Sequence, residues 1–371
     1  MNSTGQLVFP IVSKSIVYSE YGDPSSVLKC HSYEINEPKD NEIIIKNLAC
    51  PVNPSDINQI QGVYPSKPKL TTDLGTKEPS AVCGNEAVFE IIKLGKSVSG
   101  NDFKIGDWVL PAGVNFGTWR SFAVATPSDL LKISNDKISV NQAATIAVNP
   151  SSAYQMLTFY QKLQPGDWFI QNGGNSQVGK AAIQIGKKLG LNSISIVRDR
   201  PDLDSLKDEL YKLGATKVIT EEENASKQFG STIKEWLDGK SITLALNCIG
   251  GSNCTNMVRK LGKDAILLTY GGMSMKPVSI PTSLFIFKDL TAKGFWITEN
   301  IKKFPGSRPE TIAKVLKLME SGDIIDSEYS SITFDPLTTT DEEFLEAFKN
   351  AYANSKSGKQ LIRFESEYPS V

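Results

Sequence analysis

The sequence predicts an α/β protein in two parts, a mostly-β part first and a doubly wound parallel sheet after it. From residue 15 to about residue 140, short strand-like segments alternate with turns rich in proline and glycine. From residue 141, strand-like and helical segments alternate, which implies parallel strands joined by right-handed crossovers. The 371 residues suffice for two domains, because domains commonly hold about 100–200 residues.

In the first part, IKNL and VFEIIK partly alternate between apolar and polar residues, as half-buried strands do. In the second part, a helical stretch over 141–163 precedes a series of strand-like segments. These are residues 167–172, 193–199, 217–220, 244–250 and 265–271. The apolar runs LALNCI and AILLTY fit strands covered on both faces. A dinucleotide-binding domain is therefore the leading prediction.

Two further patterns concern the ends of elements and the end of the chain. Four glycines follow predicted helices, where a left-handed residue is favoured; they are Gly190, Gly214, Gly239 and Gly262. After Thr298 come a helix near 309–322, a strand over 330–334, a further helix and a final segment over 358–364. These elements are too few for a sheet of their own, so we expect the tail to fold back onto the N-terminal β part.

Charge and composition exclude several classes of function. The 40 basic and 41 acidic residues nearly cancel, and no basic stripe indicates nucleic-acid binding. The longest apolar runs are much shorter than the roughly 20 residues of a membrane-spanning helix, which predicts a soluble protein. The five cysteines are odd in number and form no CxxC pair, so we expect no disulfide scaffold and a reducing compartment.

The same composition argues against a metal centre. The chain has one histidine, His31, and no cluster of thiolates, so the usual zinc ligands are missing. We expect His31 to lie on a surface strand. The first fourteen residues contain one basic residue, Lys14, and no arginine, so a transit peptide is not evident in this chain.

The segment FIQNGGNSQVGK follows a predicted strand and opens a predicted helix. Counted as GxGxxG from Gly174 to Gly179, it has Ser176 in place of the middle glycine. A helix N-terminus at this position favours a pyrophosphate. The alternative is an ordinary turn between a strand and a helix.

A second, independent signal is VRDRP, in which Arg198 lies 19 positions after Gly179 (198 − 179). Arg198 and Arg200 flank Asp199 near the place where such folds bind the ribose. Guanidinium groups match a 2′-phosphate, which favours NADPH over NADH. The alternative is a solvated charge cluster at a strand end.

Two weaker candidates follow later strands. LLTYGGMS (267–274) ends a strand in Tyr-Gly-Gly, which lets the backbone approach a ligand closely, although a plain glycine turn would look the same. KGFWITE (293–299) holds Phe295 and Trp296, which we expect against a nicotinamide; taken alone, such residues are more often core or interface. In QGVYPSKP, Tyr64 stands between Gly62 and Pro65, and turn chemistry alone leaves it a loop aromatic.

Taken together, these segments resemble the mitochondrial 2-enoyl-thioester reductases of fungal type, in the zinc-free branch of the medium-chain dehydrogenase/reductase superfamily. The resemblance runs from about residue 15 to the C-terminus. The motifs that carry it most specifically are PVNPSDINQIQGVYPSKP, CGNEAVFEI, LTYGGMS, KGFWITE and SKSGKQLI. It implies a GroES-like catalytic domain over 1–145 and 301–371, and a Rossmann cofactor domain over 146–300.

The resemblance also implies an activity and its site. The activity is NADPH-dependent reduction of trans-2-enoyl thioesters, carried on acyl carrier protein or coenzyme A, by a homodimer in the mitochondrial matrix. Tyr64 takes the role of proton donor. The implied cofactor contacts are Asn149, Asn175, Ser176, Gln177, Val178, Arg198, Asp199, Arg200, Tyr270, Gly271, Gly272, Met273, Phe295, Trp296, Ile297 and Lys359. Zinc-dependent relatives carry GHE where this chain has CGNE, which agrees with the absence of zinc ligands.

A phenol suits the proton step, because its ordinary pKa of about 10 keeps it protonated near neutrality. Asn53, Asp56 and Asn58 adjoin the Tyr64 loop and are candidates to orient it, although such residues usually cap turns. Trp119 fits an acyl tunnel and core packing equally well. Two other functions remain open, a zinc-free NADPH quinone reductase and a non-catalytic NADPH-binding sensor.

Overall fold

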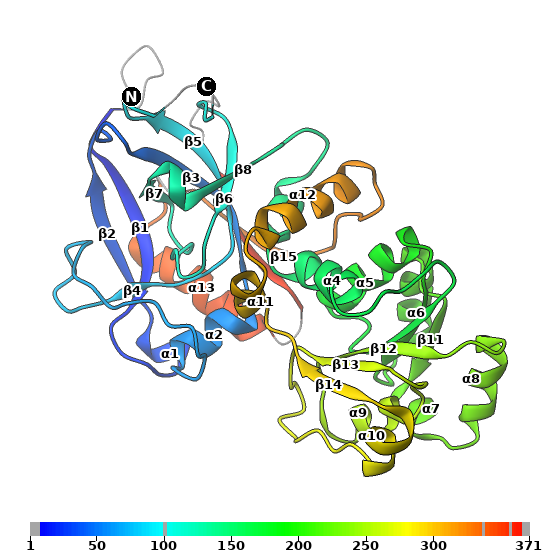
Figure 1. Ribbon diagram of the computed structural model, residues 1–371. Helices are drawn as coiled ribbons and strands as arrows, with labels where there is room; N and C mark the ends of the chain where they lie inside the picture. Colours follow the sequence, from blue (N-terminus) through cyan, green and yellow to red (C-terminus); the bar gives the residue numbers. More distant parts are fainter. Residues whose placement is uncertain (1–7, 99–101, 336–337, 356–357, 366–371) are drawn as a thin grey trace. The chain divides into compact units, whose positions relative to one another are not determined.

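The computed structural model describes residues 8–98, 102–335, 338–355 and 358–365. The chain divides into two units, Met1–Ala147 with Asp326–Val371, and Val148–Ile325 (Figure 1). The return to the first unit therefore begins at Asp326 and not near residue 301. The reason is that Gln155 joins two segments beyond residue 298 to the second unit. Its Oε1 accepts a hydrogen bond from Asn300 Nδ2 at 2.7 Å, and its Nε2 donates one to Thr311 Oγ1 at 3.0 Å.

The first unit is mostly β, as expected. A seven-stranded sheet has the order β15-β16-β3-β5-β6-β8, with β7 beside β3, and a three-stranded sheet has the order β2-β1-β4. The strands are β1 Ile11–Tyr18, β2 Lys29–Ile35, β3 Ile43–Val52, β4 Ala81–Val82, β5 Val88–Leu94, β6 Trp108–Pro111, β7 Phe122–Ala125, β8 Leu130–Ile133, β15 Ser330–Phe334 and β16 Gln360–Phe364. The helices are α1 Pro24–Val27, α2 Pro54–Ile60, α3 Val140–Thr145 and α13 Asp341–Asn354, with a short 3₁₀ turn, η1, at Pro127–Asp129.

The C-terminal tail folds back onto this unit, which confirms the prediction. Strand β16 pairs antiparallel with β3, with Gln360 opposite Val52 and Arg363 opposite Ala49. Helix α13, drawn in orange-red in Figure 1, packs on β1 and β2. At the start of α13, the Asp341 carboxylate accepts from Lys14 Nζ and, at 2.8 Å, from Ser32 Oγ.

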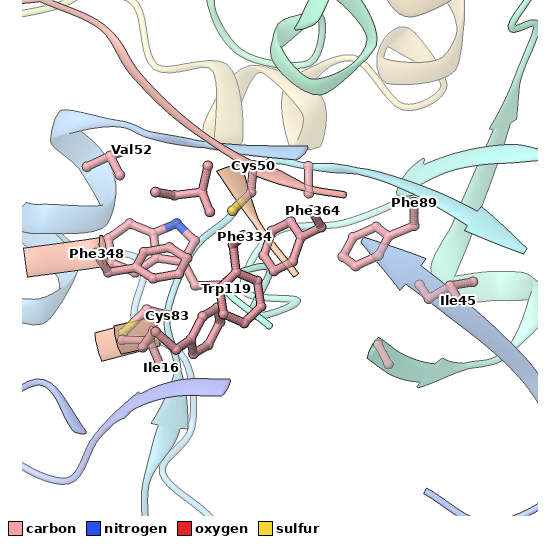
Figure 2. Packing of buried hydrophobic residues seen from close by; sticks show 14 of the residues in the cluster. Ile16, Ile45, Cys50, Val52, Cys83, Phe89, Trp119, Phe334, Phe348 and Phe364 are labelled. Carbon is pink, nitrogen blue, oxygen red and sulfur yellow. The ribbon is translucent and has the colours of Figure 1, made fainter. Parts of the chain in front are cut away.

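The core of the first unit decides between the two interpretations of Trp119, an acyl-tunnel wall and a core residue. Figure 2 shows Trp119 beside Phe348 in the packed core of this unit, and Phe334 and Phe364 belong to the same cluster. The side chain is fully buried, its ring centroid lies 4.9 Å from that of Phe348, and its Nε1 donates to the Pro51 carbonyl at 3.3 Å. Trp119 is a core residue, and the alternative of an acyl-tunnel wall is wrong.

The second unit is a parallel sheet of the order β11-β10-β9-β12-β13-β14, which confirms the predicted doubly wound fold. Its strands are β9 Trp168–Asn172, β10 Asn192–Val197, β11 Lys217–Thr220, β12 Ile242–Asn247, β13 Ile266–Thr269 and β14 Thr291–Gly294. Its helices are α4 Asn149–Thr158, α5 Gln177–Lys188, α6 Leu203–Leu213, α7 Glu221–Ala225, α8 Phe229–Leu237, α9 Gly251–Val258, α10 Thr282–Lys288, α11 Ile297–Lys303 and α12 Ser307–Glu320.

Two local predictions were wrong. The helix expected over 141–163 is two helices, because α4 restarts at Asn149 with Pro150, a residue that favours the first turn of a helix. Gly262 does not adopt the left-handed conformation, unlike Gly190, Gly214 and Gly239. Helix α9 ends before it, and a Cβ at Gly262 would lie 2.5 Å from Ser241 Cβ, so close packing explains this glycine.

His31 lies on β2, as expected, with its Nε2 at 2.7 Å from the Leu74 carbonyl. Among the described residues, no helix combines the length and the apolar character needed to cross a membrane. Of the quoted motifs, SKSGKQLI includes residues 356–357, which lie outside the described residues, as do residues 1–7 of the N-terminal stretch.

Candidate functional site

Most of the predicted cofactor residues lie at one edge of the sheet in the second unit. Residues 175–178 follow β9, residues 198–200 follow β10, residues 270–273 follow β13 and residues 295–297 follow β14. Because these strands are parallel, their carboxyl ends share an edge, and ligands of open α/β sheets bind there. Asn149 lies in the same unit as the first residue of α4.

The glycine loop after β9 has the geometry of a phosphate cradle. Gly173 adopts a left-handed φ of 62°, and a Cβ at Gly174 would lie 2.8 Å from Ser195 Cβ. Ser176 is the N-cap of α5, and its Oγ accepts from Gly179 N at 3.1 Å. The first N–H groups of α5, which include those of Gln177 and Val178, have no partner within the helix and suit a pyrophosphate. These residues fit the predicted cofactor.

Two buried asparagines end the strands β9 and β12, and none of the sequence motifs had indicated them. Asn172 Nδ2 donates to Asn247 Oδ1 at 2.8 Å, and Asn172 Oδ1 accepts from Cys248 N at 2.8 Å. Asn247 Oδ1 also accepts from Gly250 N at 3.0 Å. The bonds tie the end of β9 to the end of β12. An asparagine ending two apolar strands, FIQN and LALN, was the available signal.

The two arginines after β10 differ in their partners. Arg200 binds Asp202, with Nε to Oδ1 at 2.5 Å and Nη2 to Oδ2 at 2.9 Å. Arg198 has no hydrogen bond or ion pair with any other described residue, and its side chain is exposed. A solvent-facing guanidinium without a partner fits a 2′-phosphate, which it can bind with two parallel hydrogen bonds.

The aromatic candidates are placed differently from one another. Tyr270 Oη is buried, and no hydrogen bond of normal geometry joins it to a described residue; burial raises the pKa of this phenol well above its ordinary value. Cys248 and Ser176 are near enough to affect the pKa of this phenol, so Tyr270 lies beside the glycine loop. Phe295 is buried against Tyr160, with ring centroids 6.0 Å apart, while Trp296 is half-buried. The Phe295 side chain therefore packs on Tyr160, and Trp296 is the more accessible of the two rings.

Tyr64 lies in the first unit, on a half-buried turn that follows α2. The N–H groups of Val63 and Tyr64 both donate to the Asn58 carbonyl, at 3.0 and 3.1 Å. Gly62 has a φ of +76°, and a Cβ there would lie 2.8 Å from the Tyr21 ring carbon Cγ. Only glycine combines that backbone conformation with that close approach.

A buried polar network lies beneath this turn. Asp56 accepts from Asn53 N at 2.9 Å and from Asn85 Nδ2 at 2.8 Å. Burial raises the pKa of Asp56, and its hydrogen bonds from Asn85 and Asn53 act in the opposite direction. Asn53 and Asp56 were expected from the sequence as candidates to orient the loop. Gln59, Asn85 and Asn115, which also belong to the network, were not.

Lys359, predicted as a cofactor contact, belongs to this first unit. Its Nζ donates to Asn53 Oδ1, and Asn53 Nδ2 donates to Glu86 Oε2 at 2.9 Å. Burial lowers the pKa of Lys359, while the carboxylates of Glu86 and Asp56 act to raise it. Glu86 lies in the CGNE motif, and the described residues contain no group of three or more His, Cys, Asp or Glu side chains that would bind a metal ion.

Comparison with known proteins agrees with both units. Residues 39–135 match the alcohol dehydrogenase GroES-like domain, and residues 178–321 match the zinc-binding dehydrogenase family. The chain is 50% identical to "Enoyl-[acyl-carrier-protein] reductase 2, mitochondrial" of Debaryomyces hansenii, over 97% of this chain and 96% of that protein. The chain belongs to the mitochondrial enoyl-[acyl-carrier-protein] reductase family.

Solved structures of similar proteins have the same fold as this chain. The mitochondrial 2-enoyl thioester reductase Etr1p/Etr2p heterodimer from Candida tropicalis has a TM-score of 0.91 and 48% identity, covering 95% of this chain and 100% of that one. The Etr1p/NADP/crotonyl-CoA complex gives the same four values. This chain is also similar to the NADPH quinone oxidoreductase of Kluyveromyces marxianus. The two are 41% identical over 94% of this chain and 93% of that protein.

Proposed function

We propose that this enzyme uses NADPH to reduce trans-2-enoyl thioesters to acyl thioesters in mitochondrial fatty acid synthesis. The observation that carries the proposal is the match along nearly the whole chain to a mitochondrial enoyl-[acyl-carrier-protein] reductase. The similar Etr1p was solved with NADP and crotonyl-CoA, an enoyl thioester. The glycine loop and the arginines after β10 support the same cofactor in this chain.

The reaction needs a hydride at Cβ of the enoyl group and a proton at Cα. Bound NADPH supplies the hydride. Tyr64 supplies the proton from its phenol to Cα, so the double bond is saturated and the resulting tyrosinate is reprotonated from water. The turn after α2 holds Tyr64 by backbone hydrogen bonds, which keeps the acid in one place during the reaction.

For cofactor choice, Arg198 is the residue proposed to select NADPH. It is exposed and unpaired among the described residues, whereas Arg200 already neutralises Asp202. The remaining cofactor contacts proposed from the resemblance are Asp199, Arg200, the loop from Asn175 to Val178, Tyr270 to Met273, Phe295 to Ile297, Asn149 and Lys359.

A quinone reductase is the second candidate, because one relative carries that name. It requires NADPH but no committed proton donor at Tyr64. A non-catalytic NADPH-binding sensor is the third candidate. It predicts that the protein binds NADPH but turns over neither an enoyl thioester nor a quinone.

One assay separates these functions: NADPH oxidation with crotonyl-CoA and with a benzoquinone, for wild type, Tyr64→Phe and the control Tyr33→Phe. Tyr33 is a half-buried phenol of the same unit, 3.5 Å from the Phe122 carbonyl. We expect Tyr64→Phe to lose about 10²–10⁴-fold of crotonyl-CoA turnover, with NADPH binding intact and the control near wild type. Enoyl turnover within a few-fold of wild type would contradict the proton-donor role. Turnover of the quinone alone would favour the second candidate.

We further propose that the enzyme is a homodimer joined at β14. Within the described residues β14 pairs only with β13, and all four of its residues are exposed. The adjacent α10 exposes Ile286 (66%) and Phe287 (76%). An open parallel edge beside apolar side chains is normally covered, and a second copy of the same edge can pair with it across a two-fold axis. The similar Etr1p/Etr2p pair is a heterodimer.

A further inference from the structure

The Gln59 side chain has a central position in the network beneath the Tyr64 turn. It is 5% exposed, and each of its polar atoms is used. Gln59 Nε2 donates to the Ser66 carbonyl at 2.7 Å and to Asn115 Oδ1 at 2.8 Å, and Gln59 Oε1 accepts from Asn85 Nδ2 at 2.6 Å. One amide therefore connects the segment after Tyr64, the CGNE segment and the NFG segment.

These bonds hold the turn at both of its ends. Asn58 accepts the N–H groups of Val63 and Tyr64, and the next residue, Gln59, binds the Ser66 carbonyl two positions beyond Tyr64. The path of the chain through Tyr64 is thus fixed by two consecutive residues of α2. Pro65, between the two attachment points, restricts the backbone further because its ring sets φ.

The partners of Gln59 are themselves immobilised. Asn85 Nδ2 also donates to Asp56 Oδ1 at 2.8 Å, and Asn85 Oδ1 accepts from Asn115 N at 2.9 Å. Asn115 stands in the left-handed region with φ 64°, and its Nδ2 donates to Ser66 Oγ at 3.2 Å. A flipped Gln59 amide would set its NH₂ group against the NH₂ group of Asn85, so the network admits one orientation of this amide.

We propose that Gln59 is a positioning residue for the proton-transfer step, which it serves by fixing the turn that carries Tyr64. This inference rests on the function proposed for Tyr64. Gln59 has no contact with substrate in this role; it acts through the Ser66 carbonyl and Asn115. A reacting group misplaced by about 1 Å loses about 10²-fold in rate, so losing this amide is expected to lower kcat.

The test is a double-mutant cycle with Gln59→Met and Tyr64→Phe. Methionine keeps the approximate size of glutamine and removes its hydrogen bonds. We expect Gln59→Met to lower kcat for crotonyl-CoA about 10²-fold, with NADPH affinity unchanged. In the Tyr64→Phe background the same substitution is expected to change kcat less than about twofold, because the two residues act on one step.

The matched control is Asn47→Leu. Asn47, on β3, is also a buried amide of the first unit, and its Nδ2 donates to the carbonyls of Thr118 at 2.8 Å and Arg120 at 2.9 Å. We expect it to lower Tm to a similar extent and to leave kcat near wild type. If kcat of Gln59→Met is near wild type, or falls equally in both backgrounds, the positioning role is overturned. If Tyr64→Phe alone keeps wild-type kcat, the proposed function of Tyr64 fails instead.

Gln59→Glu gives a second test that does not depend on the stability of Gln59→Met. When ionised, the carboxylate introduced by Gln59→Glu has no proton for the Ser66 carbonyl, and it faces the Asp56 carboxylate through Asn85. Protonation restores one donor. We expect kcat of Gln59→Glu, relative to that of wild type, to rise as the pH falls toward about 5, while that of Gln59→Met stays low throughout. Parallel pH profiles for the two variants would overturn the proposal.

Discussion

Arg200 Nη2 lies 2.9 Å from Asp202 Oδ2, while Arg198, two residues earlier, has no partner among the described residues. The pair lowers the pKa of the Asp202 carboxyl through its hydrogen bonds to Arg200. Two arginines that look equivalent in VRDRP therefore differ in what they can offer a ligand. Arg198 presents an uncompensated charge, and Arg200 must share its charge with Asp202.

This difference makes a prediction about cofactor choice. Arg198→Ala is expected to raise the KM for NADPH about 10- to 100-fold, as for the loss of a charged hydrogen bond, and to change the weaker NADH reaction little. Arg200→Ala is the matched control and is expected to have the smaller effect. Steady-state kinetics with both cofactors decide the matter. Equal losses with NADPH and NADH in Arg198→Ala would refute recognition of the 2′-phosphate.

The turn at Gly62 makes a prediction about stability and rate together. Gly62→Ala introduces a Cβ at a φ of +76° and within 2.9 Å of Tyr21 Cβ. The left-handed conformation alone costs about 1–2 kcal/mol, and the contact adds to it. Gly106→Ala is the control, because Gly106 has a φ of +89° but no atom within 4 Å of the new Cβ. Denaturant unfolding should show the greater loss for Gly62→Ala, and only this variant should also lose kcat.

The contact between α13 and the N-terminal strands makes a prediction about pH. Burial acts to raise the pKa of Asp341, but its hydrogen bonds with Lys14 and Ser32 outweigh burial and hold the pKa below its ordinary value. A carboxylate with a lowered folded-state pKa stabilises the fold above the unfolded-state pKa of about 3.9 and loses this contribution as the pH falls through the folded-state pKa.

We therefore expect Asp341→Asn to lower the free energy of unfolding at neutral pH by about 0.5–1 kcal/mol, as for a partly exposed ion pair. The difference from wild type should disappear in acid, below both pKa values. Unfolding by urea at several pH values measures it. A difference that stays constant down to acid pH would contradict the ionic contribution.

The exposed edge of the second unit makes a prediction about assembly. Phe287→Lys places a charge on the apolar face of α10 next to β14 and is expected to convert the proposed homodimer to a monomer. The control is Ile325→Lys, also in the second unit, where the exposed isoleucine lies on another segment. Sedimentation gives the mass of each variant. A Phe287→Lys variant that remains dimeric, or a wild type that is monomeric, would refute the proposed interface.

The parts of the fold that the sequence predicts correctly depend on local pattern. The segments KVIT and LALN predict strands because their apolar runs are short and bounded by turns or helices. In the structure they form β11 and the end of β12. The return of the tail was predictable because its few elements needed a sheet to join. The position of the return, at Asp326, was not, since it depends on Gln155 binding α11 and α12 from far along the chain.

In the candidate site, too, the features set by local sequence pattern were predictable and those set by distant contacts were not. The carboxyl edge of a parallel sheet follows from strand order, so the edge at which the candidate cofactor residues of the second unit lie could be predicted from motifs. Trp119 could not, because the aromatic residues that surround it, such as Phe348, come from a distant segment. Gln59, Asn85 and Asn115 were missed for a related reason: each is an ordinary polar loop or helix residue until the fold joins them by hydrogen bonds.

The pairing of β16 with β3 constrains how the protein is made. During synthesis, the chain of the second unit is complete once residue 325 has emerged, and domains generally fold as units while the ribosome is still working. The first unit cannot complete its sheet until β16 has been made, because β16 pairs with β3 over Ala49–Val52 and Lys359 binds Asn53. Until then this stretch of β3 is an unpaired strand edge, which is a feature that can pair with other chains.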